Sequence, residues 1–155
     1  MKHVSTAFVL AAMLCSIGVA AEETLCAKAE TITFSCHIGK KILSICYSNH
    51  EKPFQYQYRF GRPSKVELTI AYEHGKFAEE SHPLFGGGST SLWIASNGYE
   101  YQVYGDVRRG KDNEPMFVDG LNVFKDGKTL SEKVCSDGGN GFREEIDWLP
   151  ARKEP

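Results

Sequence analysis

The chain has 155 residues, with 18 lysine and arginine residues against 20 aspartate and glutamate residues, and its net charge is -2 with histidine neutral. The basic residues come closest to clustering in the short runs at 40–41 and 108–111. Because binding a polyanion requires clustered lysine and arginine, this pattern argues against a nucleic-acid-binding protein. The length suits one domain that buries a sizeable core.

Residues 1–21 have the pattern of an export signal peptide. A basic start at Lys2 precedes an apolar stretch over residues 7–19, and small residues lead up to Glu22. The stretch is shorter than the roughly 18 residues that a membrane-spanning helix needs. We therefore expect cleavage after residue 21. Residues 22–155 would then form a single domain in the periplasm, without a membrane attachment.

The first elements expected in the mature chain are two strands of a hairpin, over residues 31–37 and 41–47, which turn at Gly39. In such a hairpin Cys36 lies opposite Leu43 and Cys46 lies opposite Thr33. The two cysteines are then offset by about three residues, or roughly 10 Å, which is too far for a disulfide.

Four cysteines follow the expected cleavage site, and an even number in an exported chain is typical of two disulfides. Because the hairpin geometry separates two of them, we expect each of these to pair outside the hairpin. This leaves two pairings open. The four cysteines are Cys26, Cys36, Cys46 and Cys135.

Two half-buried strands follow. Residues 54–60 alternate with a period of two, which places four aromatic side chains on one face and Gln55, Gln57 and Arg59 on the other. Residues 65–71 alternate in the same way. This pattern predicts strands that bury one face and expose the other.

The middle of the chain is expected to carry two polar loops around a second hairpin. Residues 72–84 lack a clear period and are interpreted as a loop with at most one helical turn, leading into a glycine-rich loop at 86–88. Strands over residues 92–95 and 99–104 then flank Ser96, Asn97 and Gly98. Asn-Gly favours a hairpin because both residues tolerate a positive φ.

The last third of the chain predicts further strands and one short helix. Residues 105–115 are interpreted as a mobile connection, residues 116–124 as one bulged strand or two short ones, and residues 128–135 as a strand after a tight Asp-Gly turn. The helical spacing of apolar residues in 142–149 predicts a short helix. Together these elements predict an all-β antiparallel sandwich or flattened barrel, with at most a short C-terminal helix.

The residue types that catalysis or metal binding requires occur without the necessary spacing. The cysteines contain no Cys-x-x-Cys pair, and His74 and His82 lack a third ligand, so we expect no metal site. No Gly-x-Ser-x-Gly motif is present, and no Lys-Ser or Lys-Thr follows residues 86–88 as in a phosphate loop. We expect neither catalytic residues nor a cofactor, although an enzyme or a small-ligand carrier stays a third alternative.

What remains is a disulfide-bonded β scaffold whose loops are rich in serine, asparagine, glycine and tyrosine, a composition typical of recognition surfaces. Several different short motifs are distributed along almost the whole mature chain. They are Cys26, Phe34-Ser35-Cys36, Gly39-Lys40-Lys41, Ser44-Ile45-Cys46, Gln57-Tyr58-Arg59-Phe60-Gly61-Arg62, Gly86-Gly87-Gly88, Ser96-Asn97-Gly98-Tyr99-Glu100-Tyr101, Phe124-Lys125-Asp126-Gly127-Lys128 and Cys135.

In these motifs the chain resembles the periplasmic inhibitors of invertebrate-type lysozyme (PliI), a family of small exported bacterial proteins. The resemblance implies a β-sandwich inhibitor whose short Ser-Gly-Tyr loop enters the lysozyme cleft and contacts the catalytic carboxylates. Ser96 and Tyr99 fit that motif best, with Asn97 as the departure from it. Since the family's glycine-rich loop often begins with serine, and Phe85 or Gly86 stands there in this chain, either loop could carry the site.

The expected target-binding residues are Ser96, Asn97, Gly98, Tyr99, Gly87 and Gly88. The resemblance implies a lysozyme as the protein partner. The alternative is a periplasmic interaction module of the cell envelope that has no lysozyme target. The sequence leaves the oligomeric state open, and a homodimer is one possibility.

Overall fold

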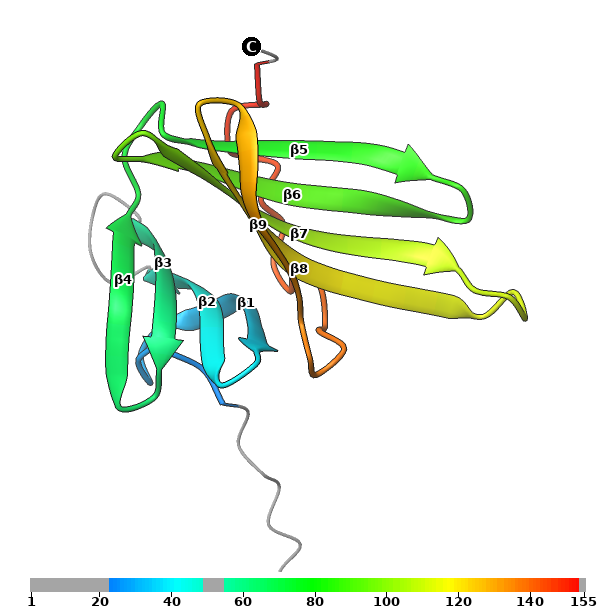
Figure 1. Ribbon diagram of the computed structural model, residues 1–155, viewed down its shortest axis with the longest axis horizontal. Coiled ribbons are helices and arrows are strands. Elements are labelled where there is room, and N and C mark those ends of the chain that lie inside the picture. Colours follow the sequence, from blue (N-terminus) through cyan, green and yellow to red (C-terminus); the bar gives the residue numbers. More distant parts are fainter. Residues whose placement is uncertain (1–22, 49–54, 154–155) are drawn as a thin grey trace, which may run out of the picture.

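The computed structural model describes residues 23–48 and 55–153, so the expected signal peptide over residues 1–21 and the aromatic residue Phe54 lie outside the described residues. The described chain forms two antiparallel sheets of four and five strands (Figure 1). The sheets pack together and do not close into a barrel. This confirms the predicted all-β fold and selects the sandwich over the flattened barrel.

The smaller sheet is a simple meander of neighbouring hairpins in the order β1-β2-β3-β4. Its strands are β1 (Thr31–Ile38), β2 (Lys41–Ser48), β3 (Gln55–Arg62) and β4 (Lys65–Ala71). The predicted hairpin and the pairing of Cys36 with Leu43 are confirmed. An irregularity between Ile32 and Phe34 moves Cys46 opposite Ile32 instead of Thr33.

The larger sheet is also a meander, in the order β5-β6-β7-β8-β9. Its strands are β5 (Phe77–Leu84), β6 (Gly87–Ser96), β7 (Tyr99–Arg109), β8 (Pro115–Lys125) and β9 (Lys128–Val134). Strands β5 to β8 extend well past the smaller sheet on one side (Figure 1). We call this side the projecting end, and the opposite side, where β6 turns into β7, the turn end.

The loop expected over residues 72–84 is wrong, because most of it forms β5, which pairs with β6 along its whole length. The glycine-rich loop is shortened for the same reason, since Gly86 lies in the turn after β5 while Gly87 and Gly88 belong to β6. The mobile connection expected over 105–115 is shortened, because β7 continues to Arg109 and β8 begins at Pro115. The errors at 86–88 and 105–115 fall at the projecting end, and the error at 72–84 runs into it along β5. No second sheet imposes an apolar face there, so the period-two pattern is weak.

Residues 116–124 lie within one strand, β8, and its register shift falls between Val123 and Phe124, near its end. The predicted Asp-Gly turn into β9 is confirmed.

The core lies between the two sheets and is built from aliphatic and aromatic side chains of both. The most completely buried ones are Phe34, Leu43, Ile45 and Tyr58 of the smaller sheet, and Phe77, Leu92, Ile94 and Val103 of the larger. The C-terminal segment adds buried Ile146 and Leu149. The sandwich therefore depends on the chain after β9 for part of its core.

No helix occurs in the described residues, so the helix expected over residues 142–149 is wrong. The segment instead satisfies the edges of both sheets. The N–H of Arg143 donates to Thr33 in β1, and Glu79 in β5 exchanges backbone hydrogen bonds with Pro150 and Arg152. These backbone groups therefore bond to the sheet edges and not to one another as in a helix. We call this irregular segment, residues 140–152, the C-terminal strap; the helical spacing of Ile146 and Leu149 reflects two points at which it is buried.

Two disulfides join Cys26 to Cys46 and Cys36 to Cys135. The expectation that each hairpin cysteine pairs outside the hairpin is confirmed. The second bond links β1 in the smaller sheet to the residue that follows β9 in the larger. It therefore ties the two sheets together.

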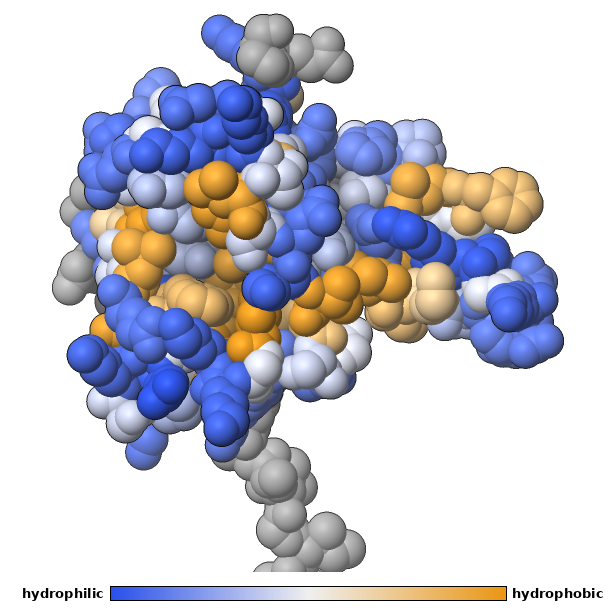
Figure 2. Space-filling view, viewed as in Figure 1, coloured by the Kyte–Doolittle hydropathy of each residue, from blue (hydrophilic) through white to orange (hydrophobic). Residues whose placement is uncertain are grey.

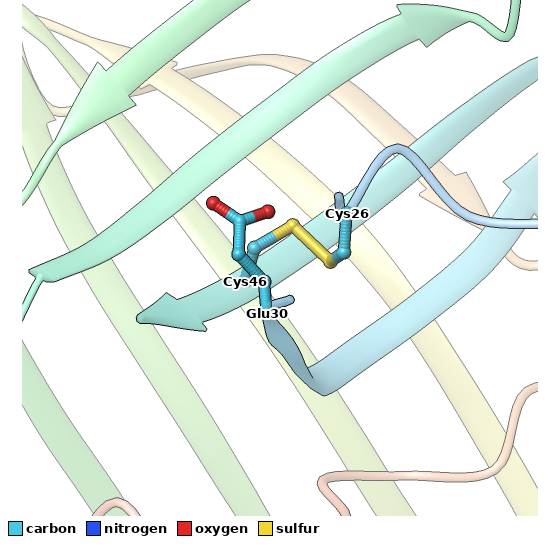
Figure 3. Close-up of side chains that lie close together, drawn as sticks. All are labelled: Cys26, Glu30 and Cys46. Carbon is cyan, nitrogen blue, oxygen red and sulfur yellow. A yellow bond between two sulfur atoms is a disulfide. The ribbon is translucent and has the colours of Figure 1, made fainter. Parts of the chain in front are cut away.

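Glu30 lies beside the bond from Cys26 to Cys46 (Figure 3). Both sulfur atoms are consumed by the disulfide, so this cluster does not offer thiolate ligands to a metal. Both carboxylate oxygens of Glu30 instead accept hydrogen bonds from the Arg59 guanidinium, at 2.6 and 2.8 Å. Burial raises the pKa of Glu30, but hydrogen bonds from Arg59 and from the Ala27 N–H outweigh it and lower the pKa below its usual value.

Candidate functional site

The hairpin of β6 and β7 ends in a tight two-residue turn. Ser96 and Tyr99 form the last pair of the ladder, and Asn97 and Gly98 between them have φ angles of 51° and 78°. Two consecutive positive φ values define the hairpin turn that Asn-Gly favours, because it matches the twist of the strands. The predicted turn is therefore confirmed in place and in type.

The turn stands clear of the rest of the described structure. Asn97 and Gly98 are exposed, and a Cβ atom built on Gly98 would meet nothing within 4 Å. Ser96 and Tyr99 are half-buried. Within residues 23–48 and 55–153, no hydrogen bond engages the Ser96 hydroxyl. Two hydroxyl groups thus flank a thin, free backbone.

A row of aromatic rings connects the turn to the core. The Tyr99 ring lies 6.4 Å from Tyr101, and Tyr101 lies 5.4 Å from the buried ring of Tyr58. The Lys125 ammonium also lies near this ring, 5.1 Å from the centroid of Tyr99. These contacts limit the orientations of the Tyr99 ring before any partner binds.

Basic side chains accompany the turn. Lys125 and Lys128 form the last pair of β8 and β9, so they lie at the same end of the sheet as Tyr99. On the outward face, the Arg152 guanidinium stacks 3.0 Å above the Trp93 ring and lies 3.4 Å from Glu100. The turn end is thus rich in cations, although the whole chain is slightly acidic.

A pocket of about 410 Å³ opens next to the hairpin. Residues 74–78 form one wall, Trp93, Ala95 and Glu100 form another, and residues 150–153 close it. The N–H of Ala95 donates to the carbonyl of Lys76 at 2.8 Å, which fixes the first wall to the hairpin. The turn therefore projects from the rim of a depression.

The other candidate residues, Gly87 and Gly88, lie at the opposite end of β6, about 30 Å from Ser96 along the strand. A Cβ atom on Gly87 would collide with the carbonyl oxygen of Val107, so glycine is needed there for the close approach of two backbones. The structure therefore does not bring the two sets of predicted site residues together.

Three residue types of a hydrolytic triad occupy one cross-strand row on the outward face of the larger sheet, namely His82, Ser89 and Asp106. In a hydrolase the histidine must lie between the serine and the acid. Here Ser89 Oγ donates directly to Asp106 Oδ1 at 2.6 Å, and Arg108 pairs with the same carboxylate. The bonding order is that of a structural network.

Lys125 and Arg152 lie beside the predicted turn, but the sequence analysis did not indicate either of them. Lys125 could have been found from the sequence. It directly precedes the Asp-Gly turn between β8 and β9, and in an antiparallel meander that turn lies at the same end of the sheet as the Asn-Gly turn between β6 and β7. Arg152 reaches Trp93 only because the C-terminal strap runs along β5, and no sequence period predicts that path.

No protein-family model, curated protein or solved structure matches the chain. The structural class of the protein therefore follows from the fold and the disulfides alone: it is a two-sheet antiparallel β-sandwich with two disulfides. Disulfides persist in oxidising compartments, so the two bonds indicate an oxidising, exported environment. Among the described residues no helix is long and apolar enough to span a membrane.

Proposed function

We propose that the mature protein is a periplasmic inhibitor that binds a lysozyme, of the invertebrate type, by inserting the turn over residues 96–99 into the active-site cleft. In this proposal the signal peptide over residues 1–21 directs export. The observation that carries the proposal is the exposed Asn97 and Gly98 turn with a hydroxyl on either side, held by the aromatic row behind it.

The chemistry of the turn fits a cleft that holds catalytic carboxylates. The hydroxyl groups of Ser96 and Tyr99 can each donate to an ionised aspartate or glutamate, which gives a charge-assisted hydrogen bond without any reaction. Asn97 and Gly98 keep the backbone narrow enough to enter a sugar-binding groove. The Tyr99 ring supplies apolar area that a sugar ring would otherwise provide.

The surroundings of the turn favour the same partner. A preformed turn on a paired hairpin loses little conformational freedom on binding, which raises affinity. The cations of Lys125, Lys128 and Arg152 complement a groove lined by carboxylates, and such complementarity speeds association and selects partners.

A cell-wall lysis assay tests the proposal. The purified mature protein is added to lysozymes of the invertebrate type and of other classes, and the loss of lytic activity is followed against inhibitor concentration. We expect inhibition of the invertebrate type at micromolar concentration or below. Full lytic activity of every class at that concentration would contradict the proposal.

A second candidate function, an envelope interaction module without a lysozyme target, is favoured by the apolar surface at the projecting end (Figure 2). Phe85 is 95% exposed and Phe117 is 53% exposed. Large apolar side chains exposed to this extent are typical of surfaces that bind a partner. If this candidate is correct, pull-down from periplasm recovers a partner that Phe85→Ser releases, while no lysozyme is inhibited.

A further inference from the structure

A second cavity, of about 340 Å³, lies on the inner face of the larger sheet at the projecting end. Two neighbouring cross-strand rows form its floor. The row of Thr90, Gly105 and Asp119 adjoins the core, and the row that contains Val107 and Phe117 lies farther out. The segment over residues 140–142 closes the cavity on the side of the core.

Asp119 is an unusual wall residue because it is a carboxyl group only 1% exposed. Its Oδ2 atom accepts a hydrogen bond from the Gly141 N–H at 2.5 Å, which explains one oxygen as an anchor for the 140–142 segment. Its Oδ1 atom is buried and has no hydrogen-bond partner in the described part of the chain. A buried polar atom without a partner is costly and calls for an explanation.

The surroundings of Asp119 compensate its charge only in part, through the backbone N–H groups of Gly141 and Asn140. Burial raises the pKa of Asp119, the Gly141 N–H opposes this, and the carboxylates of Asp137 and Asp106 raise it further. Oδ1 lies toward the bare backbone of Gly105, where a Cβ atom would be 3.3 Å away. The group that would best complement Oδ1 is therefore a cation or a strong hydrogen-bond donor, whereas an anion would be repelled.

Apart from Thr90 and Asn140, the side chains in the rest of the cavity wall are apolar. Val107, Phe117 and Phe142 contribute side chains to it, and the glycines leave room above the sheet. Phe142 is fixed by the core, because its ring lies 5.2 Å from Phe34. Aromatic faces attract cations as well as apolar groups. The volume is at the lower end of small-molecule pockets, which suits a compact ligand.

We propose that this cavity binds a small organic cation, a primary ammonium on an apolar body, with Asp119 as its anionic partner and Val107, Phe117 and Phe142 around the apolar part. In this proposal a rearrangement of residues 140–141, the irregular part of the wall, brings Oδ1 into the cavity, while the Phe142 ring stays against Phe34. The site lies at the opposite end of β6 from the 96–99 turn and does not depend on the lysozyme proposal.

The test uses 2-phenylethylammonium chloride as the probe and 2-phenylethanol as its neutral match. The mature protein is titrated near pH 7 while the amide resonances of Gly105 and Gly141 are followed by NMR, and thermal unfolding is measured in parallel. We expect saturable resonance shifts and a raised Tm with the amine but not with the alcohol, because a ligand that binds only the folded state stabilises the folded protein.

Asp119→Asn is the decisive variant, because the amide oxygen still accepts from the Gly141 N–H while the charge is removed. We expect this variant to fold and to lose the response to the amine. Phe117→Ala, a change at a half-exposed position, is expected to fold and to bind the amine about tenfold more weakly. It decides the matter alone if Asp119→Asn does not fold, and unchanged affinity there would overturn the proposal.

Three results of the titration itself would also overturn it. They are equal responses of the wild type and Asp119→Asn to the amine, equal responses of the wild type to the amine and the alcohol, and no saturable response up to about 10 mM amine.

Discussion

The two ends of the larger sheet share the same strands and differ in what covers them. At the turn end, β6 and β7 close in a two-residue turn over which no other described residue packs, and the row of rings from Tyr99 through Tyr101 leads back to the core. At the projecting end the strands run past the smaller sheet (Figure 1). Their inner face there forms the floor of a cavity whose wall contains a buried carboxyl group. Stability is concentrated between these ends, so each end is free to carry a different binding site.

The largest effect is expected in the middle, from removing the bond between the sheets. Cys36→Ala with Cys135→Ala opens a loop of 99 residues, which in the chain-entropy model costs about 4 to 5 kcal/mol of unfolding free energy. Urea unfolding under oxidising conditions measures it.

The matched control is Cys26→Ala with Cys46→Ala, whose sequence separation is 20 and whose expected cost is about 3 kcal/mol. If that pair proved the more costly, the claim that the inter-sheet bond holds the middle together would fail.

Leu92→Ala tests the middle of β6 against its ends. Leu92 is fully buried between the sheets, and truncation of such a leucine removes apolar contact and leaves a cavity. We expect a loss of about 2 to 5 kcal/mol in unfolding free energy, measured by urea or thermal unfolding. A loss below about 1 kcal/mol would mean that the core is not where the burial of side chains places it.

Ser96→Ala and Tyr99→Ala test the turn end of the same hairpin. Each is expected to weaken lysozyme inhibition by about 1 to 3 kcal/mol, as contact residues at an interface do, while thermal stability stays nearly unchanged because the pair ends the ladder. Inhibition constants and Tm values are compared with those of Ser64→Ala, an exposed serine in the β3–β4 turn. Equal losses of stability and inhibition would make Ser96 and Tyr99 structural residues.

Wherever both sheets impose a pattern, the sequence predicted the fold well. The hairpins of β1 with β2 and of β6 with β7 follow from apolar alternation and from turn residues that tolerate a positive φ. The exclusion of a bond between Cys36 and Cys46 followed from strand geometry. The choice between the two remaining pairings did not, because it depends on how the sheets stack.

Sequence reasoning failed where tertiary context replaces local pattern. Strand β5 carries glutamate, serine and histidine in its middle, where the side chains are partly buried or exposed. Its sequence therefore lacks the alternation of apolar and polar residues that would have indicated a strand. Residues 142–149 of the C-terminal strap were mistaken for a helix because the two buried residues, Ile146 and Leu149, happen to have helical spacing. In the candidate site the turn was predictable, whereas the Asp119 cavity arises from β6, β7, β8 and the strap together and has no local signal.

The smallest effect is expected at the projecting end, in the pH dependence of stability. The pKa of Asp119 is raised in the folded protein by burial, and Asp137 and Asp106 add to the rise while the Gly141 N–H opposes it. A carboxyl group with a raised folded pKa contributes stability below its unfolded pKa, about 4, and that contribution is lost as the pH rises through the folded value.

Asp119→Asn removes this titration but keeps the acceptor for Gly141. The unfolding free energy of the variant, relative to the wild type, should therefore increase as the pH rises above about 4 and then level off once the wild-type carboxyl group is ionised. Urea unfolding at a series of pH values measures the difference. A relative stability that falls with rising pH would show that the ionised carboxylate is favoured in the fold. The cavity would then already hold a partner for Oδ1, and the contrast between the two ends of the sheet would disappear.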